Sequence, residues 1–526
     1  MEFLNSIIEE VEINNFWQEY RNFCTDIDSV EIDALLNALP KLHKKLENNL
    51  SSRQLDAAIE NLTKKNASIG EELFNKILTI DNPHTFPQLA NILGGLYFSN
   101  IKSAISKTQG LILSDNDILK KIGISTIVKF DLSKEKCSTE FLHWINTILF
   151  DLSNDEDCNK LWPSIFFVSR NKRKYLENSE RIIENLATIK KIEIQLELLS
   201  YLSYNVDLET EFEKVEKYLP NLLHIDINYG GAYSQLSYFL ETLSKKQLQI
   251  ILDFLNSWIE LNIENARKIG FFTHLLNTLF DEHYQEFQKF YTSWLNHDSP
   301  NFHIAIFEMC RAGEFREISQ LTLSEEILRN YSIYDIEYIT YKILAYVYDK
   351  DSSLSLIYSI LEQKSNEKEI VLFLSEIFVD YLIFNYYSAI EFLNKKMKIA
   401  KPKLKKIIQD IIKEGEKSYS AYSELETLKE FAPSERRLNE YYRIQNKKFN
   451  KSYKEIGNNS NSFLNFAKNI HYRAGKSIFS KYRGEYTQDM TPALISHSTE
   501  MPRGEFIDPI GQAKLRLFWQ NFKRRQ

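Results

Sequence analysis

The sequence contains little glycine and proline, and few cysteines. Its 526 residues include 15 glycines, 11 prolines and 4 cysteines. The glycine and proline shares are about 3% and 2%, against about 7% and 5% in average proteins. Folds rich in β-sheet need more turn residues than this, so the composition disfavours them. The 43% hydrophobic and 26% charged fractions are those of a globular chain, which excludes disorder as the main state.

The cysteines are also far apart, at positions 24, 137, 158 and 310. They form no CxxC pair or short spacing typical of a zinc site or a disulfide framework, so we expect a reducing compartment. The N-terminus carries acid where a signal peptide needs a basic start. The most apolar stretch, residues 370–387, is interrupted by Glu376 and Asp380 and falls short of a bilayer span. We therefore expect a cytoplasmic protein with no membrane partner.

Charge is distributed unevenly along the chain. The net charge of the whole chain is -7. Residues 434–526 hold eighteen Lys and Arg against eight Asp and Glu, a net charge of +10, whereas residues 1–433 carry -17. An acidic body with a basic end indicates either a polyanion partner or a charge match within or between chains.

Apolar periodicity predicts helices almost everywhere before Pro433. In residues 244–261 the apolar side chains follow the i, i+3, i+4, i+7 spacing of one helical face. A capping box at Thr322–Glu325 predicts a second helix start. A third helix is predicted to begin near Ser332. Its expected buried face consists of Ile336, Ile339, Ile343, Leu344 and Val347.

The predicted helix starts recur at intervals of roughly 33 to 38 residues. The first helices of each pair are expected near 244, 281, 313, 351 and 387, and the second helices near 264, 299, 332, 366 and 402. In an α-solenoid each helical hairpin leaves an apolar face that the next hairpin covers. By period and pattern, residues 171–433 resemble the HEAT-like class of helical repeat, which implies an irregular solenoid. A non-repeating helical assembly is the alternative.

We therefore predict an all-α protein of three parts: a helical N-terminal region (1–170), a HEAT-like α-solenoid (171–433) and a basic, loop-rich C-terminal module (434–526). In the last part we expect a long helix over 434–453 and then a shorter helix. A loop-rich stretch follows, and a basic amphipathic helix at 514–525 ends the chain.

The known motifs of cofactor and metal sites are incomplete in this sequence. Ala474-Gly475-Lys476-Ser477 resembles the end of a phosphate-binding loop, but Ile470 stands where the first glycine is required. The histidines form no HExxH pair, and the acidic loop 151–159 lacks the glycine of a calcium-binding loop. We therefore expect no cofactor, and we interpret Lys476 as a cation on a basic helix.

The richest group of chemically active side chains lies in residues 497–509. His497, Glu500, Glu505 and Asp508 stand close to Arg503 in the sequence. Such a set could bind a divalent metal or transfer protons beside a phosphate held by the arginine, as in a metal-dependent hydrolase or nuclease component. Two alternatives stay open: specific binding without catalysis, and a structural role in which these side chains cap helix ends and pair with nearby cations.

The basic region also places aromatic residues among its cations, which suits phosphates and unpaired bases. The competing interpretation is that aromatics such as Tyr442, Phe449 and Tyr453 pack on the last repeat. Candidate residues for contact with DNA or RNA are Arg436, Arg437, Lys447, Lys448, Lys451, Arg473, Lys476, Lys481, Arg483 and Arg503.

The leading functional hypothesis is a cytoplasmic helical scaffold rather than an enzyme. It would bind a partner protein and, through the basic C-terminal region, nucleic acid. A further hypothesis is that the basic region serves only the acidic body or an acidic partner protein. Abundant Asn, Lys and Ile are typical of an AT-rich bacterial gene. By analogy with other large helical proteins of that kind, we hypothesise a component of a bacterial multi-gene system for antiviral defence.

Overall fold

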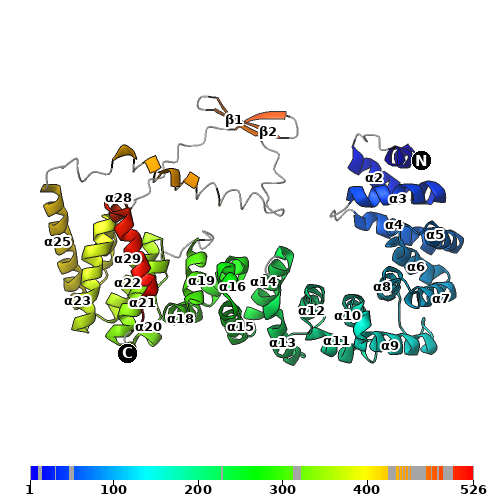
Figure 1. Cartoon of the computed structure of the whole chain (residues 1–526), viewed down its shortest axis with the longest axis horizontal. Helices are drawn as coiled ribbons and strands as arrows, with labels where there is room; N and C mark the ends of the chain where they lie inside the picture. The colour runs from blue at the N-terminus through cyan, green and yellow to red at the C-terminus, as the bar shows by residue number, and fades with distance from the viewer. Residues whose placement is uncertain are drawn as a thin grey trace. The chain divides into compact units, whose positions relative to one another are not determined.

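The computed structural model (Figure 1) divides into two compact units, unit 1 (Met1–Trp258) and unit 2 (Ile259–Gln526). It describes residues 2–9, 15–29, 31–46, 52–226, 229–311, 321–424 and 502–524, together with short stretches between 434 and 489. The domain boundaries expected near residues 170 and 433 stay predictions.

Unit 1 is built from consecutive short helices. The described ones are α1 (Glu2–Ile8), α2 (Phe16–Thr25), η1 (Ile27–Ser29), α3 (Ile32–Leu46), α4 (Ser52–Lys65), α5 (Ala67–Ile80), α6 (Gln88–Ser99), α7 (Ile101–Ile112), α8 (Asp117–Thr126), η2 (Ile127–Lys129), α9 (Thr139–Asn154), η3 (Glu156–Cys158), α10 (Trp162–Asn171), α11 (Ser179–Ala187), α12 (Ile192–Tyr204), α13 (Phe212–Tyr218), η4 (Leu219–His224) and α14 (Gly230–Ser244). The next helix, α15 (Leu248–Leu261), spans the division between the units.

Unit 2 continues in the same manner. Its described helices are α16 (Ile263–Arg267), η5 (Ile269–Phe272), α17 (Thr273–Glu282), α18 (Tyr284–Leu295), α19 (Pro300–Arg311), α20 (Glu325–Leu328), α21 (Ile333–Tyr346), α22 (Lys350–Gln363), α23 (Lys368–Glu376), the π-helical η7 (Ile377–Ile383), α24 (Ser388–Met397), α25 (Pro402–Glu424), α28 (Arg503–Ile507) and α29 (Pro509–Asn521). The prediction of an all-α helical repeat array is confirmed.

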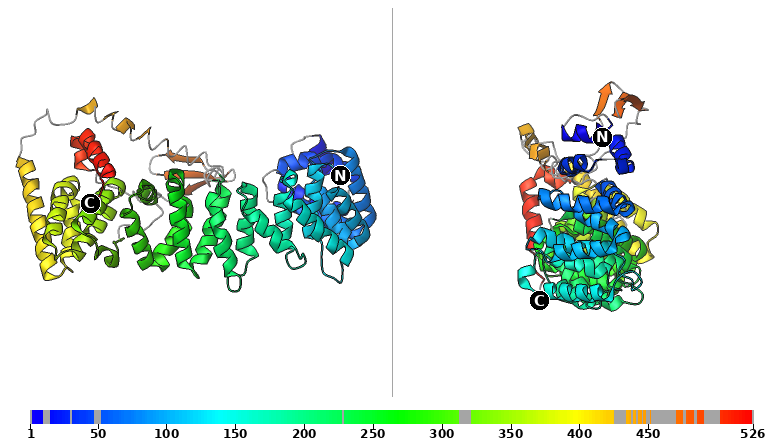
Figure 2. Two further views of the ribbon diagram at one scale, coloured as in Figure 1. Left: turned by 60° about the horizontal axis from the view of Figure 1, so that its bottom comes forward. Right: turned by 90° about the vertical axis from the view of Figure 1, so that its right-hand side faces the viewer.

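Within each unit, helices pack mainly on the helices next or next but one in the sequence, as α4 does on α6 and α21 on α22. The starts predicted at 299, 332, 366 and 402 lie within two residues of the observed starts of α19, α21, α23 and α25. The start predicted at 313 lies outside the described residues. The finer resemblance to HEAT-like repeats stays a prediction. A clear departure from local packing is α29, which lies against α21 (Figures 1 and 2).

The start of α21 follows the sequence closely. The Ser332 hydroxyl accepts a hydrogen bond from the Asp335 amide, and the Asp335 carboxylate accepts one from the Ser332 amide. The capping box predicted at Thr322–Glu325 is wrong, because α20 begins after Ser324 without a side-chain cap. The Thr322 hydroxyl instead accepts a hydrogen bond from Gln288 of α18 (2.5 Å). A tertiary contact has replaced the local one.

A three-stranded antiparallel sheet, in the order β1-β2-β3, is a local exception to the helical fold. It consists of β1 (Ile470–Ala474), β2 (Ser477–Tyr482) and β3 (Glu485–Asp489), with Tyr472 opposite Phe479 and Lys481 opposite Tyr486. The shorter helix expected in this region is therefore wrong here. In the sequence, two residues separate β1 from β2 and two separate β2 from β3, and each pair includes a glycine, a spacing that is typical of β-hairpins.

Two helical glycines in unit 1 give a direct test of the packing of α6 on α4. A Cβ atom at Gly95 would lie 2.0 Å from the Thr63 hydroxyl and 2.3 Å from the Glu60 carbonyl oxygen, whereas one at Gly110 meets nothing within 4 Å. We expect Gly95→Ala to lower the free energy of unfolding by about 1–3 kcal/mol. Gly110→Ala should raise it by up to about 1 kcal/mol. Urea unfolding of both variants checks this, and equal stabilities would contradict the close approach.

Candidate functional site at the docked C-terminal segment

Residues 502–524, named here the C-terminal segment, fold into two short helices for local reasons. Pro509 stands in the first turn of α29, where its missing amide proton has no cost. The Asp508 carboxylate accepts a hydrogen bond from the Gly511 amide (2.8 Å) and caps the same helix. A carboxylate at this end also opposes the positive pole of the helix dipole. The segment thus carries its own start signals.

Trp519 anchors the segment to unit 2. It is the buried residue of α29, with 5% of its surface exposed. Its ring meets Tyr381 of η7 edge-on, at 4.8 Å between centroids, and lies parallel to Tyr341 of α21 at 6.3 Å. A tryptophan between two tyrosine rings contributes a large apolar contact area. The edge-to-face arrangement with one of them is also a preferred geometry for aromatic pairs.

Lys342 of α21 receives the end of α29. Its ammonium group donates hydrogen bonds to the carbonyl oxygens of Gln520 (2.7 Å), Phe522 (3.0 Å) and Trp519 (3.3 Å). The Trp519 carbonyl also accepts a hydrogen bond from the Phe522 amide at 3.3 Å. Carbonyls at the end of a helix lack the full set of partners within it, and a cation here opposes the negative pole of the dipole. Lys342 is 3% exposed, and burial lowers its pKa to about 8, while Asp298 acts in the opposite direction. The amine therefore still carries its proton at pH 7.

Arg524 fixes the chain just beyond α29. Its guanidinium donates to the Asp335 carboxylate at 3.2 Å, and to the backbone carbonyl and side-chain oxygen of Asn296, the latter at 2.9 Å. The Asp298 carboxylate lies 3.6 Å from a guanidinium nitrogen of Arg524. The guanidinium carbon lies over the Tyr338 ring, 5.1 Å from the ring centroid. The Nε atom of Arg524 is buried without a hydrogen-bond partner among the described residues.

The beginning of the segment is held as well. The Gly504 amide donates to the Asn385 side chain at 2.9 Å, and a Cβ atom at Gly504 would collide with Gln512 at 2.4 Å. The Arg503 guanidinium stacks 4.0 Å from the Tyr419 ring centroid. Since Tyr419 belongs to α25, this contact fixes the start of the segment against α25.

Arg516 links the middle of the segment to the body. Its guanidinium lies 4.1 Å from the Tyr348 ring centroid and 3.6 Å from the Glu505 carboxylate. Together with Arg503 and Arg524, it is a cation of the basic region that makes contacts within the chain.

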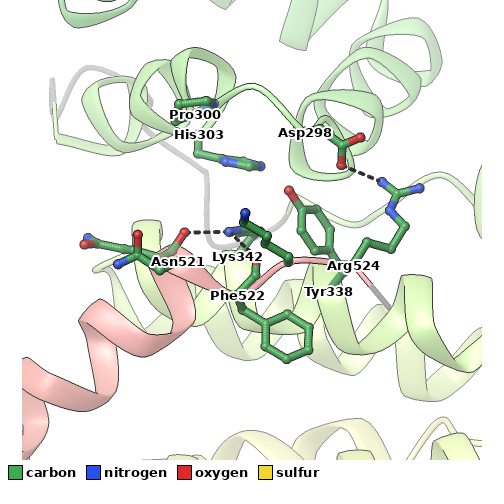
Figure 3. A pocket seen from close by; sticks show the side chains of 10 residues that line it. Asp298, Pro300, His303, Tyr338, Lys342, Asn521, Phe522 and Arg524 are labelled. Atoms are coloured by element: carbon green, nitrogen blue, oxygen red, sulfur yellow. Dashed lines mark hydrogen bonds and ion pairs between the residues drawn. The ribbon is translucent and has the colours of Figure 1, made fainter. Parts of the chain in front are cut away.

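A cavity of about 570 Å³ lies where the end of the segment meets α19 and α21 (Figure 3). His303 points into it, is 2% exposed, and has its Nε2 atom 3.2 Å from the Leu295 carbonyl oxygen. Burial, with a smaller effect of Lys342, lowers the pKa of His303 to about 3, so the ring is neutral at pH 7. The cavity is lined by Asp298, Pro300, His303, Tyr338, Lys342, Gln520, Asn521, Phe522, Lys523 and Arg524.

These contacts suit binding more than catalysis. The Lys342 ammonium donates to carbonyl oxygens of the segment, and the Arg524 guanidinium pairs with carboxylates and carbonyls of unit 2. Neither group therefore remains available as a proton donor or base. Within the described ranges, no group of three or more His, Cys, Asp and Glu is placed to hold a metal ion.

Of the candidate catalytic residues, only Glu505 and Asp508 fall in the described chain. His497 and Glu500 lie outside it. Asp508 caps α29 and Glu505 lies beside Arg516, and neither lines the cavity.

The candidate nucleic-acid residues fall into four groups. Arg436, Lys447 and Lys451 are exposed. Arg473 and Lys481 belong to β1 and β2, and Arg503 stacks on Tyr419. The remaining candidates, Arg437, Lys448, Lys476 and Arg483, lie outside the described residues.

Sequence reasoning missed the residues that receive the segment, above all Lys342. One signal was present: Lys342 interrupts the apolar face of α21 between Ile339 and Ile343. A lysine among buried residues indicates a polar partner from elsewhere in the chain. The identity of that partner could not be read from the local sequence.

No protein-family model and no curated protein matches the sequence. The chain is similar to one in a homology model of the full-length AP-3 complex in an intermediate open conformation. The identity is 12%, 78% of this chain and 77% of that chain are covered, and the TM-score is 0.30. It is also similar to an engineered protein of known crystal structure, at 13% identity, 79% and 99% coverage and a TM-score of 0.23. Both scores are too low to support a shared fold.

The low pKa of His303 predicts the direction of an acid effect. The unfolded histidine binds its proton near pH 6.5 and the folded one only near pH 3. Between these values the unfolded state binds more protons, so stability falls as the pH falls, at up to about 1.4 kcal/mol per pH unit. His303→Gln retains a donor for the Leu295 carbonyl but does not titrate. In urea unfolding from pH 7 to pH 4 it should lose less stability than the wild type, and parallel curves would contradict this.

Proposed function

We propose that this protein is a helical scaffold that binds a partner protein on the outward face of α29. One observation carries the proposal. The inward face of α29 is fixed to unit 2 through Trp519, whereas Ile510, Leu517 and Phe518 are 64%, 56% and 56% exposed. In both views of Figure 2, α29 lies at the edge of the helices of unit 2.

The spacing of these residues makes one stripe. Positions 510, 517 and 518 are i, i+7 and i+8 of a helix and so share a face. Ile507 of α28, which packs on α29, is also exposed. Contiguous exposed apolar side chains on a fixed helix are typical of protein interaction sites. Lys514 and Lys523 are exposed in the same segment, so the partner is expected to offer an apolar helix or groove with acidic residues at its rim.

A pair of substitutions tests this surface. The binding partner would first be captured with the full chain and then purified, so that its dissociation constant can be measured by calorimetry. Leu517→Ser with Phe518→Ser should weaken binding at least about tenfold, since each buried side chain contributes about 1.5–3 kcal/mol. The matched control is Ile399→Ser, at an 80% exposed position outside the segment, which should change affinity less than about twofold. Equal affinities for both variants, or no partner, would contradict the proposal.

We propose nucleic acid as a second ligand, because the cations of residues 434–526 divide into two groups. Arg503, Arg516 and Arg524 make contacts within unit 2. Residues 434–501 still hold twelve basic against six acidic side chains, and Arg436, Lys447 and Lys451 among them are exposed. This distribution supports contact of DNA or RNA phosphates with the cations before residue 502, and gives Arg503 a structural role.

Charge reversal distinguishes a site from general attraction. Lys447→Glu with Lys451→Glu should lower the affinity for labelled DNA or RNA at least about tenfold at low salt. The slope of the salt dependence should also fall by about one unit for each phosphate that is no longer bound. Lys405→Glu with Lys406→Glu on α25, also exposed, makes the same change in net charge. If this control weakens binding equally, binding follows net charge alone. Absence of binding by the wild type would remove this second function.

Two sequence-based hypotheses stay predictions. The first is the metal-dependent hydrolase or nuclease component with a site at His497, Glu500, Glu505 and Asp508. The capping role of Asp508 and the contact of Glu505 with Arg516 do not favour it. The second is membership of a bacterial antiviral defence system.

A further inference from the structure

The surface beneath the C-terminal segment recognises it in the way a receptor recognises a peptide. This receiving surface consists of Asn296, Asp335, Tyr341, Lys342, Tyr381 and Asn385. The two tyrosines form a slot for a tryptophan. The lysine binds the end of a helix directly after that tryptophan, and Asp335 with Asn296 binds an arginine five residues beyond it.

The fit between segment and surface is incomplete. A cavity of about 570 Å³ remains beside Lys342 and Arg524, and the Arg524 Nε atom is buried without a partner among the described residues. The interior of a protein is packed about as densely as an organic crystal, so a space of this size marks a loose fit at the end of the segment. Of α29, moreover, only Trp519 is buried. A segment held by one buried side chain, by ring contacts of Phe518 and Phe522 with Tyr341 and by a few charged contacts resembles a bound ligand more than a core element.

The covalent link between the C-terminal segment and the rest of the chain also makes the segment comparable to a bound ligand. Residues 425–501 join α25 to α28, so docking of the segment is an intramolecular binding event. The covalent connection between the segment and its surface sets the effective concentration of the segment. Modest intrinsic affinity is then sufficient for docking, and a second helix of similar chemistry can compete for the same surface.

We propose that the receiving surface is a binding site for a helical segment of a partner protein, and that the chain's own C-terminal segment occupies it as an internal competitor. The partner segment carries a tryptophan in its last helical turn and an arginine five residues later. This site lies beneath α29, whereas the surface proposed above lies on its outward face. The two are tested with different probes, and of the residues substituted for the outward face only Phe518 also touches the receiving surface, with its ring 6.3 Å from that of Tyr341.

A synthetic peptide of residues 502–524, labelled with fluorescein, serves as the probe, and anisotropy with the full-length chain is the measurement. In the wild type the internal segment competes with the peptide. In Trp519→Ala the competitor is weakened while the receiving surface stays intact. The Trp519→Ala chain should bind the peptide at least about tenfold more tightly than the wild type. This factor is expected if the receiving surface is unoccupied in about 10% or less of the wild-type molecules.

Two controls locate the binding. Lys342→Ala added to Trp519→Ala should remove the gain, because the peptide's helix end then has no cap. A peptide that itself carries Trp519→Ala should bind at least about tenfold more weakly than the unchanged peptide, since its anchor is missing. Arg524→Ala is a second way to weaken the competitor if Trp519→Ala proves unfolded by circular dichroism, and it should produce a smaller gain in the same direction.

Equal or absent binding of the peptide to the wild type and to folded Trp519→Ala and Arg524→Ala would overturn the proposal and leave the segment a fixed part of unit 2. A wild-type chain that dimerises with rising concentration, and whose dimers the peptide dissociates, would make a second copy the occupant and overturn the assignment to a partner protein. Because no partner is needed in this experiment, its outcome is independent of the test of the outward face.

Discussion

The structure depends on one repeated constraint: each helix must bury one apolar face against a neighbour a few elements away in the sequence. On α21, Ile336, Ile339 and Ile343 are completely buried. Such a face can be covered by the preceding and following helices, which is the packing observed within each unit. A chain that meets this constraint locally needs few long-range contacts, because every hairpin supplies the cover of the one before it.

The C-terminal segment obeys a different rule. It crosses back to α21 from 177 residues away, and it is held by one buried tryptophan and several charged groups. Burying the Lys342 ammonium has a high desolvation cost unless its donors are satisfied. The carbonyl oxygens at the end of α29 supply the acceptors, so the lysine and the helix end depend on each other. Polar contacts of this kind give specificity of position and register more than strength.

This arrangement changes the meaning of the charge asymmetry. The positive end of the chain is not one uniform basic surface. Arginines of the C-terminal segment pair with Asp335 of the acidic body and with Glu505 of the segment itself, or stack on tyrosines. The hypothesis that the basic region serves only the acidic body or an acidic partner stays a prediction. Arg436 and Lys447, which precede residue 502, are exposed, and the proposed contact with a polyanion is assigned to this part of the chain.

The sheet at 470–489 shows where composition misleads. The small number of glycines and prolines is an average over the whole chain, and it correctly indicated helices for unit 1 and for the part of unit 2 that ends with α25. Five of the 15 glycines, however, fall after residue 433. Two of them, Gly475 and Gly484, occupy the two-residue connections between strands. A local count, set beside Tyr472, Ile478 and Phe479, would have predicted hairpins there.

The sequence by itself determined the helices, their rhythm and the separation of charge, because helix formation and amphipathic packing depend on residues three and four positions apart. It also contained the cap of α21 at Ser332 and the amphipathic end of the chain. Only the tertiary structure decided that Trp519, Lys342 and Arg524 meet their partners, and that Asp508 and Glu505 do not line the cavity. No local spacing encodes the approach of side chains so far apart in sequence. Their meeting results from the packing of the whole of unit 2.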